Sequence, residues 1–263
     1  ALLARQRQYE LRGLLTGLRE ADRRKTEFLA MLAHELRNPL APMSNAVTLL
    51  TLKAPTPDEI SKYCQLMQRQ IDHMVRLVDD LLEVSRITRG KIELRMESVE
   101  LGSIIRAAVE QSRPLFERAG HTFTVELEPG DGLVVRGDPL RLTQIFANLL
   151  NNAAKYTAPG GRINVAVRSD AGQVQVLIAD NGIGIEPQML GSIFEMFVQV
   201  NDTSKAAQGG LGIGLTLVRA LVELHGGRVS AFSDGLGRGA RFCVSFPLSS
   251  ASANLRSLPA ARA

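Results

Sequence analysis

The strongest constraint on the fold is a helical repeat of apolar residues in the first third of the chain. Between residues 60 and 81, apolar side chains recur at alternating intervals of four and three residues: Ile60, Cys64, Met67, Ile71, Met74, Val78 and Leu81. This spacing keeps them on one face of an α-helix. A similar seam runs through residues 11–32 and continues as an apolar stripe to Leu50. The repeat predicts two long helices, the first spanning residues 5–53.

A short turn separates these two helices. Residues 54–58 (APTPD) are typical of a turn, and Asp58 is the candidate N-cap of the second helix. Pro39 and Pro42 are expected to disturb the first helix, because proline lacks an N–H and crowds the preceding turn. Two long helices joined in this way form an antiparallel hairpin with little core of its own. Two copies would close a four-helix bundle, so the sequence predicts a homodimer.

The pattern changes after Arg89-Gly90 to a mixture of strands and helices. Strands are expected at residues 91–99, 121–127, 163–167, 174–179, 228–233 and 240–247. Helices are expected at residues 103–119, 139–157 and 214–225. Such a mixture favours an α+β sandwich. We therefore expect a multidomain α and α+β chain, in which a helical hairpin precedes a sandwich domain.

Composition narrows the classes of function. The chain has a formal net charge of +4, its basic residues are scattered among acidic ones, and it contains no Trp. We therefore expect no nucleic-acid-binding surface. No stretch approaches the roughly 18 apolar residues of a membrane span, so this fragment is expected to make no membrane contact. The two cysteines read as reduced thiols of a cytoplasmic chain. Because the chain begins without Met, we interpret it as a fragment of a longer parent protein. This interpretation leaves open an upstream sensor domain or a membrane anchor.

The first candidate site surrounds His34. This residue lies two positions from both Leu32 and Leu36, and therefore on the helix face away from the apolar stripe. Glu35 is an adjacent carboxylate that can accept a proton or orient the imidazole, and Asn38 follows one turn later on the same face. A neutral imidazole is a useful phosphoryl acceptor. The alternative is an ordinary solvated helix surface.

A second candidate site lies in the helix expected at residues 139–157. Asn148 and Asn152 are four residues apart on one helix face, and Lys155 follows within a turn. An amide oxygen is a hard ligand suited to Mg²⁺, which keeps phosphate and water among its ligands. Lysine supplies positive charge for phosphates. The alternative is an ordinary polar helix face.

Two glycine-rich segments complete the candidate residues. Asp180 follows a strand and can accept a hydrogen bond from an adenine amino group, while Gly182 and Gly184 allow a close backbone approach to a ligand. A second segment leads into a helix, whose free N–H groups favour phosphate, and contributes Gly210, Gly212 and Gly214. No Gly-Lys-Ser/Thr follows it and no strand leads directly into it, which excludes a P-loop and a dinucleotide fingerprint.

About 25 residues separate Ile185 from Gly209, which is long for a connection without a function. Lys205 lies within this connection and is a candidate for the γ-phosphate, against the alternative of a solvated lysine. His225 is expected to end its helix before a glycine cap rather than to bind a ligand.

Taken in order, these motifs resemble the H, N, G1, F and G2 boxes of sensor histidine kinases. The matching segments are HELRNPL at 34–40, NLLNNAAKYT at 148–157, DNGIG at 180–184, FEMF at 194–197 and GGLGIGL at 209–215. The resemblance covers residues 28 to about 248. It implies a dimeric four-helix bundle followed by a Bergerat-type α/β sandwich that binds ATP and Mg²⁺.

The resemblance also implies a role for each matched residue. His34 would be the phosphoacceptor, Glu35 the general base, and Asn38 the residue that positions a water for a phosphatase reaction. The second group would bind the nucleotide. Asn152 would be the Mg²⁺ ligand with Asn148 in support, Lys155 would lie near phosphate, and Tyr156 would lie against the nucleotide. Asp180, the glycines of the two loops and Lys205 would complete the ATP-binding site.

The implied domains are a signalling coiled-coil helix (1–22), a dimerisation and histidine phosphotransfer domain (23–90), a catalytic ATP-binding domain (91–248) and a flexible tail (249–263). Residues 86–91 are the natural hinge between the second and third of these. The implied partners are a second copy of the chain, a response-regulator receiver domain and an upstream sensor domain.

Two other functions share parts of this pattern. A GHKL-type ATPase, related to gyrase, Hsp90 and MutL, would carry a catalytic glutamate where this chain has Asn148, which is a poor base. An inactive scaffold that binds nucleotide and dimerises would have lost chemical residues, and here all of them are present. Both alternatives are distinguished from a kinase by whether His34 becomes phosphorylated.

Overall fold

The computed structural model describes residues 2–52, 55–88, 92–127, 133–170, 172–196, 198 and 212–249. Its helices are α1 (Leu2–Leu52), α2 (Pro57–Thr88), α3 (Leu101–Ala119), α4 (Pro139–Tyr156) and α5 (Gly214–Leu224). The chain divides into two compact units, and the boundary between them falls inside α2, between Leu82 and Glu83. None of the helices in the described part of the chain combines the length and the apolar character needed to cross a membrane.

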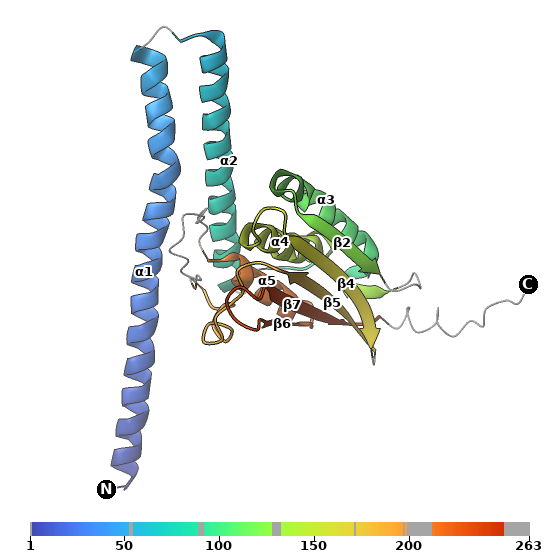
Figure 1. The fold of residues 1–263 in the computed structure, drawn as a ribbon. Helices are drawn as coiled ribbons and strands as arrows, with labels where there is room; N and C mark the ends of the chain where they lie inside the picture. The colour runs from blue at the N-terminus through green and yellow to red at the C-terminus, as the bar shows by residue number, and fades with distance from the viewer. Residues whose placement is uncertain are drawn as a thin grey trace, which may run out of the picture. The chain divides into compact units, whose positions relative to one another are not determined.

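In the first unit, α1 and α2 run antiparallel as a hairpin (Figure 1). A capping box begins α2: the backbone N–H of Thr56 donates to Glu59 Oε2 at 2.9 Å, and the N–H of Glu59 donates to Thr56 Oγ1 at 3.4 Å. Pro57 occupies the first helical position, where its missing N–H costs little. Thr56 is therefore the N-cap, and the expectation that Asp58 caps this helix is wrong.

Helix α1 does not end at either proline. It continues past Pro39 and Pro42 to Leu52, and Pro39 is buried. The side chains of most residues before Leu32, including much of the expected seam at 11–32, lie outside the described residues. Along the rest of the hairpin, several large apolar side chains are exposed in the single chain: Leu40, Val47, Ile60, Ile71, Val75, Val78 and Leu82.

The second unit is an α/β sandwich. Its five-stranded sheet has the order β2-β4-β5-β7-β6, with β2 parallel to β4 and the other neighbours antiparallel. The strands are β2 (Thr122–Leu127), β4 (Arg162–Asp170), β5 (Gln173–Asp180), β6 (Arg228–Phe232) and β7 (Ala240–Pro247). Two further strands, β1 (Glu97–Glu100) and β3 (Val134–Gly137), form a small antiparallel sheet. Helices α3, α4 and α5 cover one face of the large sheet (Figure 1).

The core of this unit lies between the sheet and the three helices. Alternate residues of β4 and β5 point inward and are buried, as expected for strands with one covered face: Ile163, Val165, Val167, Val174, Val176 and Ile178. Helix α4 contributes Phe146, which packs edge-on against Phe246 of β7 with ring centroids 6.5 Å apart. This packing fixes α4, and with it the candidate ATP-binding residues, against the sheet.

The expected fold class is confirmed, with two local differences. The strand expected at residues 91–99 is reduced to β1, because residues 92–96 form no regular element. Strand β3 was not expected, since its four residues are too few to show a periodic pattern.

Candidate active site

The first group of candidate residues meets on one face of α1. Asn38 lies one turn beyond His34, and its Nδ2 is 3.2 Å from His34 Nδ1. Glu35 Oε1 lies 3.9 Å from the same ring nitrogen. The imidazole is 70% exposed, whereas the Glu35 side chain is only 13% exposed. The structure thus brings together the three residues that the sequence singled out.

Both polar neighbours of His34 approach Nδ1, and no polar contact from the described residues reaches Nε2. The NH₂ group of Asn38 donates to Nδ1 when that nitrogen carries no proton, and after rotation of the amide its oxygen would accept from an Nδ1–H instead. In the second arrangement, the lone pair of Nε2 faces solvent on an exposed ring. The group can therefore hold the imidazole by one nitrogen and present the other for reaction.

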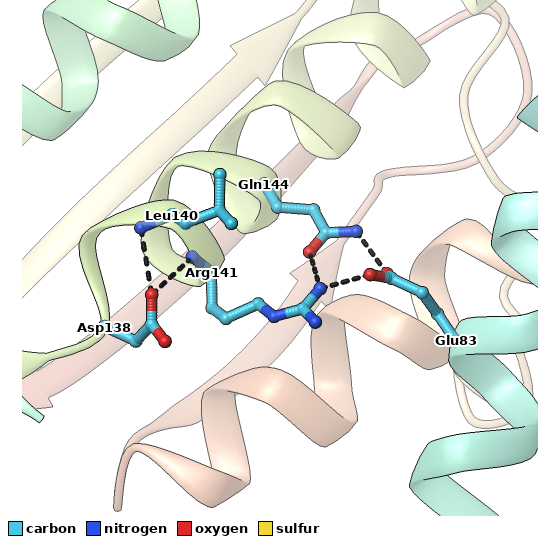
Figure 2. Close-up of polar contacts among 5 residues, drawn as sticks. All are labelled: Glu83, Asp138, Leu140, Arg141 and Gln144. Carbon is cyan, nitrogen blue, oxygen red and sulfur yellow. Dashed lines mark hydrogen bonds and ion pairs between the residues drawn. The ribbon is translucent and has the colours of Figure 1, made fainter. Parts of the chain in front are cut away.

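The second group lies on α4. Asp138 caps this helix: its Oδ1 accepts from the N–H groups of Leu140 and Arg141 at 3.0 and 3.2 Å (Figure 2). Asn148 and Asn152 follow on one half-buried face, and no hydrogen bond joins either amide to another residue in the described part of the chain. Half-buried amides without a protein partner suit a ligand, because leaving them unpaired is costly.

The C-terminal end of α4 carries the remaining residues of this group. Lys155 is exposed, and its Nζ lies 5.0 Å from the centre of the Tyr156 ring. Asn151, which the sequence did not single out, has a buried Oδ1 without a hydrogen-bond partner among the described residues. Its only signal in the sequence was its place beside Asn152.

Asp180 ends β5 beside the C-terminal end of α4. Its Oδ1 accepts from the backbone N–H groups of Gly182 at 2.9 Å and Ala240 at 3.3 Å, and no described residue donates to Oδ2. Burial raises the pKa of the Asp180 carboxyl, although the two N–H groups lower it in part. One oxygen is therefore fixed by the backbone, and the other is available to a ligand.

The glycines after Asp180 are required by protein packing. A Cβ on Gly182 would lie 2.2 Å from the carbonyl oxygen of Tyr156, and one on Gly184 would lie 2.1 Å from that of Gly235. Gly184 also has a φ of 74°. The sequence explained both glycines by the approach of a ligand, whereas the backbone that approaches them here is the chain's own.

A loop between β6 and β7 supports this segment and was missed at the level of sequence. The Ser233 hydroxyl donates to the carbonyl of Gly239 at 2.7 Å and accepts from the N–H of Ile185 at 3.0 Å. A Cβ on Gly239 would lie 2.0 Å from the carbonyl oxygen of Asp180. The glycine-rich run SDGLGRGA between two expected strands was the available signal.

The lid and the hinge are only partly described. Lys205 and Gly210 lie outside the described residues, as do residues 89–91 of the expected hinge. Gly212 has a φ of 65°, and Gly214 is the first residue of α5. His225 follows α5, and both of its ring nitrogens bind backbone: Nδ1 lies 2.7 Å from the carbonyl oxygen of Leu221, and Nε2 accepts from the N–H of Asp138 at 3.0 Å.

Comparisons with known proteins agree with this arrangement. Residues 24–90 match the His Kinase A (phospho-acceptor) domain, and residues 137–250 match the histidine kinase-, DNA gyrase B- and HSP90-like ATPases. The chain is 34% identical over 233 residues to the autoinducer 2 sensor kinase/phosphatase LuxQ of Vibrio cholerae. That alignment covers 87% of this chain but only 27% of LuxQ.

Solved structures give the same result. The mycobacterial sensor histidine kinase MprB is 30% identical, with a TM-score of 0.51 and coverage of 58% of this chain and 97% of that one. Full-length ShkA, solved in complex with AMPPNP, is 30% identical, with a TM-score of 0.63 and coverage of 85% of this chain and 46% of that one. A phosphoacceptor hairpin followed by an ATP-binding sandwich defines the two-component histidine kinases. This chain belongs to the sensor histidine kinases of that class.

Proposed function

We propose that this chain is the kinase core of its parent protein, which binds Mg-ATP and transfers the γ-phosphoryl group to His34. The observation that carries the proposal is the convergence of Glu35 and Asn38 on Nδ1 of an exposed imidazole. A ring held by Nδ1 can attack through Nε2 without first losing a hydrogen bond. Phosphoryl transfer depends mainly on such positioning and on the neutralisation of charge.

In the proposed reaction, the Nε2 lone pair of His34 attacks the γ-phosphorus of ATP. A bond forms between nitrogen and phosphorus, the bond from that phosphorus to the β–γ bridging oxygen breaks, and ADP leaves. The ring then carries an excess proton on Nδ1, which the carboxylate of Glu35 can accept after a small rotation from its present 3.9 Å. Because Glu35 is largely buried beside the ring, its carboxylate is held close to that proton.

The nucleotide would bind along α4 and the loop after β5. Asn152, with Asn148 in support, would hold Mg²⁺, which supplies positive charge to the phosphates. The free Oδ2 of Asp180 would accept from the adenine amino group. Lys155, Tyr156 and the expected lid with Lys205 would contact the rest of the nucleotide. Among the described residues, neither the amides of Asn148 and Asn152 nor Oδ2 of Asp180 has a hydrogen-bond partner, which supports this proposal.

The partners follow from the same proposal. A second copy of the chain would cover the exposed apolar side chains of α1 and α2, which are unfavourable in water. The phosphoryl group would pass from His34 to an aspartate of a response-regulator receiver domain, and the chain would work in the cytoplasm. The chain spans only 27% of the length of LuxQ, which leaves room for an upstream sensor domain in a parent protein of similar length. The domain limits at residues 22, 90 and 248 stay predictions.

The reverse, phosphatase reaction on the partner is proposed for Asn38. Its amide is exposed and lies one turn from the phosphoacceptor, where it can orient a water toward a phosphoaspartate. LuxQ is itself named a kinase/phosphatase. A GHKL-type ATPase or an inert scaffold is not favoured, since Asn148 stands where such an ATPase needs a base and the phosphoacceptor group is complete.

The deciding experiment is incubation of the chain with γ-labelled ATP and Mg²⁺, beside His34→Ala. Acid-labile, base-stable label is expected on the wild-type chain, with less than about 1% of it on the variant, because no other acceptor takes the place of the imidazole. Equal label on both proteins would mean another acceptor. ATP binding without label on either would favour the inert scaffold.

A further inference from the structure

Ser233, the first residue after β6, bonds to two separate segments of the chain through one hydroxyl group. The hydroxyl donates to the carbonyl oxygen of Gly239 at 2.7 Å and accepts from the backbone N–H of Ile185 at 3.0 Å. It also accepts from the N–H of Gly235 at 3.3 Å, within its own loop. Because the side chain is half-buried, water would replace these bonds only in part if the hydroxyl were removed.

The bond to Gly239 leads to the held oxygen of Asp180. Gly239 precedes Ala240, whose N–H donates to Asp180 Oδ1 at 3.3 Å. The N–H of Gly239 itself donates to the carbonyl oxygen of Gly182 at 3.1 Å, and the N–H of Gly182 donates to the same Oδ1 at 2.9 Å. Ser233 therefore holds the residue that lies beside one of the two N–H donors and is bonded to the other.

The loop between β6 and β7 and the loop after β5 move as one hydrogen-bonded unit. The N–H of Gly237 donates to the carbonyl oxygen of Ile183 at 2.6 Å, and a Cβ on Gly239 would lie 2.0 Å from the carbonyl oxygen of Asp180. Among the described residues, the Ser233 hydroxyl is the one side-chain group of the β6–β7 loop that bonds to the loop after β5. It can therefore be removed without altering the backbone contacts directly.

We propose that Ser233 is a positioning residue for adenine recognition and acts through Asp180. The inference rests on the proposed function, in which Oδ2 of Asp180 accepts from the adenine amino group. That oxygen faces the base only while Oδ1 is held by its two N–H donors. Without the hydroxyl, Gly239 and Ile185 lose a shared partner, the N–H of Ala240 is held less firmly, and the carboxylate spends less time in the orientation that binds adenine.

The test measures ATP binding by titration calorimetry to the wild-type chain and to Ser233→Ala. The Kd for ATP should rise about three- to tenfold, as for the loss of one hydrogen bond. The rate of His34 labelling at saturating ATP should stay within about twofold of wild type, because Ser233 affects the binding of the base and not the transfer step. An unchanged Kd would overturn the proposal.

Ser245→Ala is the matched control. The Ser245 hydroxyl also donates to a backbone carbonyl, that of Arg228 at 3.4 Å. Ser245 pairs with the first residue of β6, whereas Ser233 follows the last. The control variant thus loses the same kind of bond at the opposite end of the strand, and it should bind ATP as wild type does. A Kd raised equally in both variants would overturn the proposal, since it would reflect a general weakening of the sheet.

A double-mutant cycle decides whether Ser233 acts through Asp180. In the Asp180→Asn background, Ser233→Ala should weaken ATP binding by less than about twofold, because the contact that it positions is already lost. A full three- to tenfold loss in that background would overturn the proposal and leave Ser233 with a purely structural role. Calorimetry needs no phosphoryl transfer, so a wild-type chain that binds ATP without labelling His34 would refute the proposed kinase function, while the cycle would still decide the role of Ser233.

Discussion

At the scale of single residues, the candidate site separates atoms that other groups of the chain hold in place from atoms left for a ligand. Nδ1 of His34 and Oδ1 of Asp180 each have polar neighbours from the chain itself. Nε2 of His34 and Oδ2 of Asp180 have none among the described residues. A side chain held by one atom keeps its orientation while the other atom reacts or binds, which lowers the entropy that binding must overcome.

Asp180→Asn tests the adenine contact. In this variant the backbone N–H groups should keep the side-chain oxygen, which leaves the NH₂ group facing the nucleotide. Two donors would then oppose each other, so we expect the Kd for ATP to rise about 10- to 100-fold, as for the loss of a hydrogen bond to a charged group. Titration calorimetry with ATP and with GTP measures this effect.

The comparison with GTP provides the specificity control, because guanine presents a carbonyl oxygen where adenine presents its amino group. The preference for ATP over GTP should therefore shrink in Asp180→Asn. Asp170→Asn makes the same change at an exposed position. Asp170 is the last residue of β4, whereas Asp180 pairs with the beginning of that strand, so this variant should bind ATP as wild type does. An unchanged Kd for ATP in Asp180→Asn would refute the adenine contact.

At this scale, contacts between residues could be predicted from the sequence only where the residues are close together in the chain. His34 and Asn38 could be placed together because residues four apart on a helix are neighbours. The close approach of Gly184 to Gly235, and the bonds of Ser233 to the loop after β5, join residues about 50 positions apart. No local pattern contains such pairs, which is why the structural reason for those glycines was misread.

At the scale of elements, α4 and α5 are joined by a buried polar link. His225, which follows α5, accepts from the N–H of Asp138, the N-cap of α4. Burial lowers the pKa of the His225 imidazole, against the opposing effects of its bond to Leu221 and the charge of Asp138. Burial would raise the pKa of Asp138, but the N–H groups of Arg95, Arg141 and Leu140 and the charge of Arg141 outweigh it.

This link predicts a loss of stability in mild acid. Because the folded-state pKa of His225 lies below the unfolded value of about 6.5, the unfolded chain binds the proton more tightly. The contribution of His225 to the free energy of unfolding is therefore fully present above that pH and declines as the pH falls below it. Urea unfolding at a series of pH values measures this, and each unit of pKa difference corresponds to about 1.4 kcal/mol.

His225→Gln is the variant for this measurement. It should be less stable than wild type at pH 7.5 by about 1–2 kcal/mol, since a buried hydrogen bond is altered, and its stability should fall less between pH 7 and 5.5. The difference between the two proteins at each pH removes the contribution of groups they share. Parallel profiles would show that His225 does not titrate in this range.

Elements were predictable where their pattern is long. Helices α3, α4 and α5 lie close to their expected bounds because their apolar periodicity extends over ten or more residues, whereas β4 and β5 extend beyond the shorter apolar segments that predicted them. The cap of α2 was misplaced because Asp58 is also a good capping residue by type. The reciprocal bonds between Thr56 and Glu59, with Pro57 between them, decide in favour of Thr56.

At the scale of the whole molecule, the helical hairpin leaves large apolar side chains exposed to solvent in the single chain. Val75 and Val78 of α2 are 53% and 45% exposed, although each lies on a helix rich in apolar residues. Burying one such side chain contributes about 1.5–3 kcal/mol. A symmetric dimer would bury every such residue twice, which makes a second copy the natural cover for this face.

The substitution that tests this dimer is Ile71→Glu with Val78→Glu, which introduces four charges into the predicted bundle. Each charge would have to be buried without a partner, so we expect the dimer Kd to rise at least about 100-fold and the chain to sediment as a monomer at micromolar concentration. Gln65→Glu with Gln68→Glu adds the same charge at exposed polar positions of α2 and should remain dimeric. Circular dichroism establishes that the helices are retained. A double variant that still sediments as a dimer would place the interface on a different surface, since no bundle seam accommodates four unpaired carboxylates.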